Sequence, residues 1–385
     1  MALDRATGDR IRAISVWCSL LVCLNHACTL PGIDADTLGE SWALSSSLIQ
    51  IAVKAGLACI ATPFFFMVAA FLIFRAVFPL SDEPVGTVHG ESLLRHRAEV
   101  IKRMRSLVVP FLMVSAWSFA LMMTLQSLPG LSGRASAPLA ERPLADLVLT
   151  LFWNPVAYPL WFVRNLFLLC LAVPLIAPIL RHRRVGLGAC AVAAAAWFAW
   201  SDLSVTRSIL FFLIGGWMAI HRPTVAAPRA TTVVALLGLW VALACAHGSW
   251  ILAQGATNAV LNNVGITVGL VAVWFASDHL RSLVESALVQ RISAYTFFIY
   301  IAHEPIATLA RKAAIGVIGA HNHHLALLSA WVVLGGALFL GTLASGMLLA
   351  RYAPKGYALV SGGRLPRRAP ATQPALQPVR ELQSA

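Results

Sequence analysis

The sequence predicts an all-α fold, a polytopic transmembrane helical bundle of about ten spans with both termini on the cytoplasmic side. Hydrophobic residues make up 59% of the 385 residues, and only 12% are charged. The mean hydropathy is +0.77. An average soluble domain instead carries about 25% charged and about 45–50% apolar residues. Because apolar stretches recur along almost the whole chain, residues 1–352 are predicted to form one membrane domain.

The individual spans follow from length, since a membrane helix needs roughly 20 mostly apolar residues. The candidate segments are 11–30, 57–78, 106–126, 159–180, 185–201, 208–221, 231–247, 259–276, 294–310 and 325–350. The sixth is short for a full span, and the fifth is only weakly apolar. The first follows basic residues, as a signal peptide would, but it is long and contains Asn25 and His26, so we predict a retained helix.

The basic residues between the spans predict the orientation. With the N-terminus inside, 21 of the 29 lysines and arginines fall in inner segments. The outer segments hold Arg134, Arg142, Arg207, Arg311 and Lys312. Cytoplasmic loops carry an excess of Lys and Arg, so this asymmetry supports an even number of spans with both ends inside.

The net charge of +13 does not call for a nucleic-acid partner, because the basic residues lie between apolar segments facing the lipid bilayer. Residues 353–385 are predicted to be a cytoplasmic tail, whose abundance of Pro, Arg, Gln and Ala from Ser361 onward predicts disorder. His321, His323 and His324 form a His-rich outer loop. We interpret it as an ordinary polar loop, and no metal site is predicted.

Four polar residues at membrane depth form the candidate site, because such residues are costly in a bilayer and usually serve a function. His26 lies in the outer half of the first span, and Arg164 lies roughly 7 Å below the outer surface in the fourth. His303 and Glu304 lie roughly 13–15 Å into the ninth. They are predicted to line one cavity. The alternative is that each histidine only bonds a neighbouring helix and that Glu304 neutralises a neighbouring charge.

Arg12 shares a face of the first helix with His26. Fourteen positions at about 100° per residue return to within about 40° of the same direction. The rise between them is roughly 21 Å, which places Arg12 at the inner mouth of the predicted cavity.

Six stretches carry short motifs in a fixed order. They are RIRAISVWCSLLVCLNHA (10–27), TPFFFMVAAFLIFR (62–75), IKRMRSLVVPFL (101–112), YPLWFVRNLFLL (158–169), FFLIGGWMAIHRP (211–223) and ISAYTFFIYIAHEPI (292–306). Together they resemble the acyltransferase-3 family of membrane acyltransferases over roughly residues 8–350. The first contains that family's arginine-then-histidine pair, and the last contains its Tyr-x-x-His core.

The sequence departs from the family's pattern in two places. The family usually has ten residues between the arginine and the histidine of the first helix, whereas thirteen separate Arg12 from His26. The face is kept, but Arg12 lies deeper toward the cytoplasm. A Ser-Gly pair of the second helix is replaced by Ala69 and Ala70, which implies a changed packing contact.

The resemblance implies an enzyme, an acyltransferase that transfers groups other than aminoacyl groups. It implies transfer of an acyl group, usually acetyl, from acyl-CoA to a hydroxyl of a carbohydrate or lipid-linked glycan. No permanently bound cofactor is implied, and acetyl-CoA would be the donor substrate. The Ala- and Arg-rich composition indicates a GC-rich bacterium, and hence a location in the cell inner membrane. There, the resemblance implies O-acetylation as a polysaccharide modification.

The residues suit that chemistry. His26 would act as general base toward the acceptor hydroxyl, or would carry the acyl group in a covalent intermediate. Glu304 or His303 would orient His26 or relay its proton. Arg164 would stabilise the thioester oxyanion or bind an anionic acceptor group.

The donor phosphates would lie at the inner mouth. Basic residues there that could hold them are Arg12, Lys102, Arg103 and Arg105. For the last three, orientation by the positive-inside rule is an equally good explanation.

Two other functions fit the same pattern. A transporter or flippase of a glycan or lipid-linked precursor would also have polar residues around a cavity, and would more naturally show acidic relays or internal repeats. A non-catalytic sensor or scaffold would tolerate replacement of His26 and Arg164.

Overall fold

The computed structural model describes residues 4–29, 41–79, 87–127, 139–201, 203–223, 225–318 and 324–366. These residues form helices and no strand. The helices are α1 (Arg5–His26), α2 (Ser41–Ala55), α3 (Ala61–Val77), α4 (Gly90–Arg103), α5 (Val109–Ser127), α6 (Leu144–Phe152), α7 (Trp161–Leu171), α8 (Val173–Arg181), α9 (Arg183–Ala199), α10 (Ser204–His221), α11 (Ala230–Gln254), α12 (Ala259–His279), α13 (Arg281–Val284), α14 (Ala287–Ser293), α15 (Thr296–Ala302), α16 (Ile306–Ile318), α17 (His324–Tyr352) and α18 (Pro354–Val360). Short helical turns connect some of them: η2 (Leu57–Ile60), η3 (Met104–Val108), η5 (Leu139–Glu141) and η6 (Tyr158–Leu160).

Six segments of the described chain are long and apolar enough to cross a membrane. They are Ser46–Val77, Gly90–Ser127, Ser204–His221, Ala230–Gln254, Ala259–His279 and Leu325–Tyr352. A bent pair, Tyr158–Leu171 and Val173–Arg181 at 66°, makes a seventh if it is one span. Each overlaps a predicted span, although Ser46–Val77 and Gly90–Ser127 begin well before the spans predicted at 57–78 and 106–126, and the chain is an integral, multi-pass membrane protein.

The other three predicted spans coincide with helices that are charged, short or interrupted. α1 carries Asp9, Arg10 and Arg12 in its first half. α9 has 17 residues, and α15 is separated from α16 by residues 303–305. The count of ten spans and the orientation of the termini therefore stay predictions.

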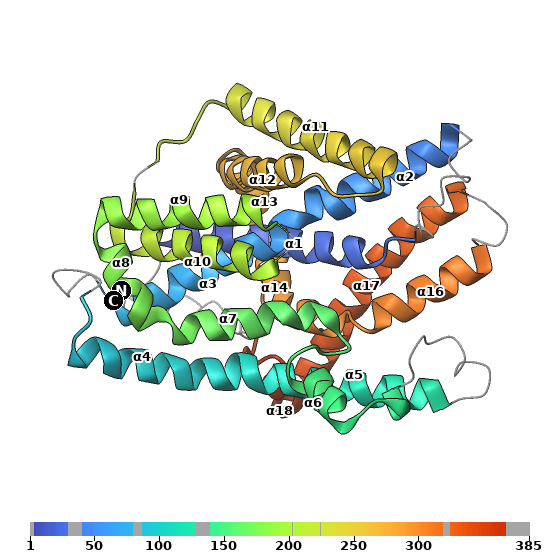
Figure 1. Cartoon of the computed structure of the whole chain (residues 1–385), viewed down its shortest axis with the longest axis horizontal. Helices are drawn as coiled ribbons and strands as arrows, with labels where there is room; N and C mark the ends of the chain where they lie inside the picture. The colour runs from blue at the N-terminus through green and yellow to red at the C-terminus, as the bar shows by residue number, and fades with distance from the viewer. Residues whose placement is uncertain are drawn as a thin grey trace, which may run out of the picture.

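The span predicted at 106–126 is the second half of a longer continuous helical segment. α4, η3 and α5 continue as one helical segment, Gly90–Ser127 (Figure 1). At η3 the helix widens into a π-helical turn just before Pro110. Proline has no N–H, so in an α-helix it would leave the Ser106 carbonyl without its usual donor. That carbonyl is available to another partner, which the C-terminal segment supplies.

α1 runs through the middle of the bundle and packs against α2, α3, α14 and α17 (Figure 1). Beside it, α3 and α10 approach closely, because Gly215 lies directly against Met67 and an added Cβ would overlap the Met67 carbonyl. Small residues permit such close approach between membrane helices. Phe162 joins this core to α15, since its ring centroid lies 4.6 Å from Phe66 and 5.3 Å from Tyr300.

The prediction of disorder from residue 353 is wrong for the first part of the C-terminal segment. α18 is helical, and Tyr357 in it is fully buried. The Tyr357 ring centroid lies 5.8 Å from Tyr295 and 5.5 Å from Phe298. These ring contacts join α18 to α15 and to the turn before it, and such tertiary contacts cannot be read from composition. Residues 367–385, and His321 and His323 of the His-rich loop, lie outside the described residues.

Candidate functional site

His26 occupies the last turn of α1 and is buried, with 8% of its surface exposed. Neighbouring helices fix the end of α1. Trp331 Nε1 donates to the Leu24 carbonyl at 2.8 Å, and Thr29 Oγ1 donates to a carbonyl of α17 at 2.6 Å. The Thr29 N–H donates to Gln50 Oε1 at 3.0 Å. The Trp331 bond satisfies one of the carbonyls that a helix C-terminus leaves open, and the Thr29 bonds fix the chain just beyond His26.

The break between α15 and α16 presents His303 and Glu304 to α1. Pro305 has no N–H to continue α15, which ends at Ala302. His303 is fully buried, and Glu304 is 3% exposed. The Glu304 carboxylate accepts from the first turn of α16, from the Thr308 N–H at 3.3 Å and from Thr308 Oγ1 at 3.0 Å. The positive end of the helix dipole favours the ionised carboxylate there.

His26 contacts three polar side chains from two other parts of the chain. Its Nδ1 lies 3.4 Å from Glu304 Oε1 and 3.0 Å from the Tyr158 hydroxyl. The ring centroids of His26 and His303 lie 4.7 Å apart. The structure thus brings together three of the four residues predicted to line one cavity.

Hydrogen bonding determines which nitrogens carry protons. An ionised carboxylate only accepts, so the Glu304 contact places a proton on His26 Nδ1 and leaves Nε2 unprotonated. His303 Nδ1 donates to the Ile299 carbonyl at 3.2 Å, which leaves its Nε2 as an acceptor. That Nε2 is buried and has no hydrogen-bond partner in the described part of the chain. His26 Nε2 can therefore accept a proton or hydrogen bond, and His303 Nε2 is a buried acceptor without a partner among the described residues.

Two tyrosines belong to the same centre and are absent from the predicted site. Tyr158 begins η6, and Tyr300 holds that turn by donating its hydroxyl to the Pro159 carbonyl. The Tyr300 ring centroid lies 6.0 Å from that of His303. Both tyrosines lie in motifs that the sequence already singles out. Each is an uncharged residue within a mostly apolar segment, so the sequence does not mark it as a site residue. Only the fold shows that the two tyrosines lie close to His26 and His303.

Arg164 lies on α7 and turns to a different partner. Its guanidinium lies 4.3 Å from the Trp153 ring centroid and donates to the Trp153 carbonyl. Nε donates to Asn165 Oδ1 at 3.2 Å. Within the described ranges it contacts neither His26 nor Glu304. An aromatic face and a carbonyl are sufficient partners for an arginine near a membrane surface.

Besides Arg164, Arg311 is a second arginine in the outer half of the predicted membrane domain. Arg311 lies in α16, which begins two residues after Glu304. Arg311 Nε is buried and makes no hydrogen bond to any described residue. The sequence places Arg311 just beyond a predicted span, whereas α16 continues to Ile318.

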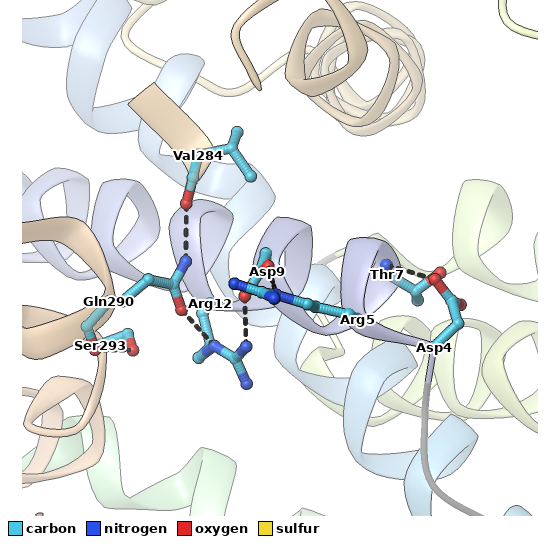
Figure 2. A network of polar contacts seen from close by, with 8 residues as sticks. All are labelled: Asp4, Arg5, Thr7, Asp9, Arg12, Val284, Gln290 and Ser293. Carbon is cyan, nitrogen blue, oxygen red and sulfur yellow. Dashed lines mark hydrogen bonds and ion pairs between the residues drawn. The ribbon is translucent and has the colours of Figure 1, made fainter. Parts of the chain in front are cut away.

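Arg12 lies toward the other end of α1, among polar side chains (Figure 2). It donates from Nη2 to Asp9 Oδ1 and from Nε to Gln290 Oε1. Gln290 in turn donates from Nε2 to the Val284 carbonyl at 2.6 Å. Asp9 also lies 3.8 Å from Arg5. Because the Arg12 side chain is 48% exposed, part of its guanidinium stays open to an anion.

The three basic residues just before the third predicted span differ in their exposure. Lys102 and Arg103 share Glu99, with nitrogen–oxygen distances of 3.1 Å and 3.4 Å. Lys102 and Arg105 face solvent, whereas the Arg103 side chain is only 18% exposed. Arg103 Nε is buried and has no hydrogen-bond partner among the residues described. Arg103 is therefore the member of this run whose surroundings differ from those of an ordinary surface charge.

A cavity of about 380 Å³ lies between α5, α6 and the segment that leads to η6. Its polar lining includes Gln126, Arg142, Asp146, Thr150 and Asn154. Asn154 follows Trp153, the partner of Arg164. Across the described ranges, no group of three or more His, Cys, Asp or Glu side chains is placed to hold a metal ion.

Comparison with known proteins identifies one family. Its model, described as an acyltransferase domain, matches residues 9–351. No curated protein and no solved structure gives a match. The matched range contains His26, Tyr158, His303 and Glu304, and it ends before α18.

Proposed function

The chain belongs to the acyltransferase-3 family and is a membrane acyltransferase, and we propose that it moves an acyl group from acyl-CoA to a hydroxyl of a carbohydrate or glycan. The observation that carries this proposal is the buried contact between His26 Nδ1 and Glu304 Oε1. A carboxylate that orients a histidine is the arrangement by which enzymes activate a hydroxyl. We further propose that the acyl group is acetyl, and that the reaction is O-acetylation of polysaccharide at a bacterial inner membrane.

The transfer uses groups that the chain itself supplies. His26 Nε2 takes the proton of the acceptor hydroxyl as the hydroxyl oxygen attacks the thioester carbonyl carbon. Glu304 stabilises the imidazolium through Nδ1. The carbon–sulfur bond then breaks, and the leaving thiolate takes the proton back from His26 Nε2. The products are an ester of the acceptor and free CoA thiol.

Negative charge develops on the thioester oxygen in this reaction. The Tyr158 hydroxyl can accept part of the hydrogen bond from His26 Nδ1 and keep its own proton to donate to that oxygen. We propose that Arg311, whose buried Nε has no hydrogen-bond partner among the described residues, adds positive charge there. These two residues take the oxyanion role that the sequence assigns to Arg164. Arg164, next to the polar cavity at Asn154, is better placed to meet an anionic acceptor group.

The experiment that tests the proposal follows label from radiolabelled acetyl-CoA into cell-envelope glycans. Membranes that contain the protein should incorporate label into glycan, and matched membranes without it should not. Transport or flipping of a precursor predicts movement of glycan without incorporation of label. Label on the protein itself when no acceptor is present would show that His26 reacts through a covalent intermediate.

Replacing Tyr158 with phenylalanine should lower kcat about tenfold, because the change removes one hydrogen bond to His26 and one donor to the oxyanion. The apolar ring contacts stay. Steady-state kinetics on purified protein measure the effect. The matched control is Tyr352→Phe, because Tyr352 is also exposed but lies at the C-terminal end of α17. Equal kcat values for Tyr158→Phe and the unmodified protein would remove the hydroxyl from the mechanism.

Glu304→Gln should lower kcat about 100-fold with little change in KM, because a neutral amide cannot stabilise the imidazolium that forms on His26. Thr308→Val keeps the carboxylate and removes one of its hydrogen bonds, so a fall of only a few-fold is expected. If both variants lose activity equally, Glu304 serves the fold of the α15–α16 break and not the reaction.

A further inference from the structure

We propose that Arg364, which lies beyond the matched domain, joins Arg103 in a site that binds a phosphate group of the acyl-CoA donor. This inference rests on the proposed function and adds a residue that no family motif contains. The ligand chemistry is a phosphate ester or diphosphate, whose oxygens accept the fork of hydrogen bonds that guanidinium groups donate.

The C-terminal segment is held firmly against η3. Arg364 Nη1 donates to the Ser106 carbonyl at 3.0 Å and to the Ser361 carbonyl at 2.8 Å. In α-helical geometry the Ser106 carbonyl would accept from the N–H of residue 110, which Pro110 does not have. Gly362 adopts a left-handed φ of 66°, and a Cβ there would overlap the Ser106 carbonyl. This close approach explains why glycine stands at position 362.

The Arg364 guanidinium also stacks on an aromatic ring of α15, the helix that ends just before His303. Its central carbon lies 3.9 Å from the Phe297 ring centroid on α15. Both hydrogen bonds use Nη1, and Nε and Nη2 make none to any described residue. The guanidinium is therefore oriented by fixed neighbours while part of its donor fork is unused.

Positive charge accumulates around Arg364. Burial and the nearby Arg103 lower the pKa of Arg364 to about 10, so it remains a cation at neutral pH. Glu99 is the acidic group beside Arg103, and it is shared with Lys102. Keeping two partly buried guanidinium groups together is costly unless sufficient negative charge lies between or beside them.

Two buried polar atoms at this position lack partners within the described ranges. Arg103 Nε is one, and Ser106 Oγ is the other. Ser106 is 8% exposed and belongs to the same turn whose carbonyl holds Arg364. Buried donors without partners are rare in folded proteins, and each calls for a ligand or water. A phosphate is a ligand that would satisfy an arginine and a serine at once.

The position fits a donor that spans from phosphate to thioester. Phe297 and His303 lie six residues apart along α15 and its end, which corresponds to a rise of about 9 Å. A phosphate beside Arg364 and a thioester beside His26 are thus at two levels of the same helix. The pantetheine arm of CoA joins its phosphates to its sulfur and is longer than this rise, so it can reach from one level to the other.

The test compares two donors on the full-length protein in nanodiscs of zwitterionic lipid. Acetyl-CoA carries the phosphates, and acetyl-pantetheine carries the same thioester without them. Arg364→Gln should raise KM for acetyl-CoA by about 10- to 100-fold and leave KM for acetyl-pantetheine unchanged. Arg364→Lys should show a smaller rise, because it keeps the charge and loses the fork. Arg351→Gln, which removes an exposed arginine from the end of α17, should change neither value.

Each other outcome overturns the assignment. An equal loss with both donors would make Arg364 a structural residue, and no change would remove it from donor binding. An effect that appears only in nanodiscs containing anionic lipid, for both donors alike, would assign the site to a phospholipid headgroup. If Arg364→Gln does not fold, Arg364→Lys and binding of adenosine 3′,5′-bisphosphate by calorimetry decide the question.

If the unmodified protein turns over neither donor, the proposed function itself fails. Turnover with unchanged Arg364 variants defeats only this inference.

Discussion

His26→Ala is expected to lower kcat/KM for acyl transfer by about 1,000-fold or more, while the protein stays folded. General-base catalysis by a positioned histidine contributes about 100- to 10,000-fold. Here the same side chain also returns the proton to the leaving thiolate, so its removal affects both halves of the reaction. Alanine leaves the Glu304 carboxylate with its two bonds from Thr308, which keeps that buried charge partnered.

The measurement is acetyl transfer per folded molecule, with a second buried histidine as the control. His247 on α11 is 2% exposed, and its ring contacts the Ala55 carbonyl at 3.1 Å and the Asn258 N–H at 3.2 Å. His247→Ala should lower stability and leave kcat nearly unchanged. Activity in His26→Ala within a few-fold of the unmodified protein would place the reaction elsewhere. Recovery of activity with added imidazole would show that only the base is missing.

Gly215→Ala is expected to destabilise the bundle by about 3 kcal/mol or more, at the upper end of the usual cost of overpacking. The new Cβ would overlap the Met67 carbonyl, which is backbone and cannot rotate away. α3 and α10 would have to separate. Alanine favours a helix over glycine by about 1 kcal/mol, so the overlap must first cancel that gain. Because Phe66 on α3 packs on Phe162, the separation would also disturb the support of η6.

Gly238→Ala is the matched control for this change. Gly238 lies inside α11, and a Cβ there would meet nothing within 4 Å. The thermal unfolding midpoint in detergent should fall by several degrees for Gly215→Ala and stay equal or rise for Gly238→Ala. Equal midpoints for the two variants would show that α3 and α10 are not held at the distance described.

By itself, the sequence determined the class of protein and part of its site. Length and hydropathy are properties of single segments, so they identify apolar helices without any knowledge of their neighbours. The cost of polar groups in a bilayer likewise singles out His26, His303 and Glu304, which the structure brings together. The order of the motifs indicated the family.

Only the tertiary structure decided which polar groups meet. Helical periodicity gives the face on which a residue lies, but not the helix that this face contacts. Arg164 and Tyr158 lie six residues apart, and the sequence favoured the arginine because it is charged. In the fold, Arg164 is satisfied by Trp153, and Tyr158 is the residue at His26. Arg364 reaches Ser106 for a similar reason, since a carbonyl freed by Pro110 is a partner that no sequence pattern records.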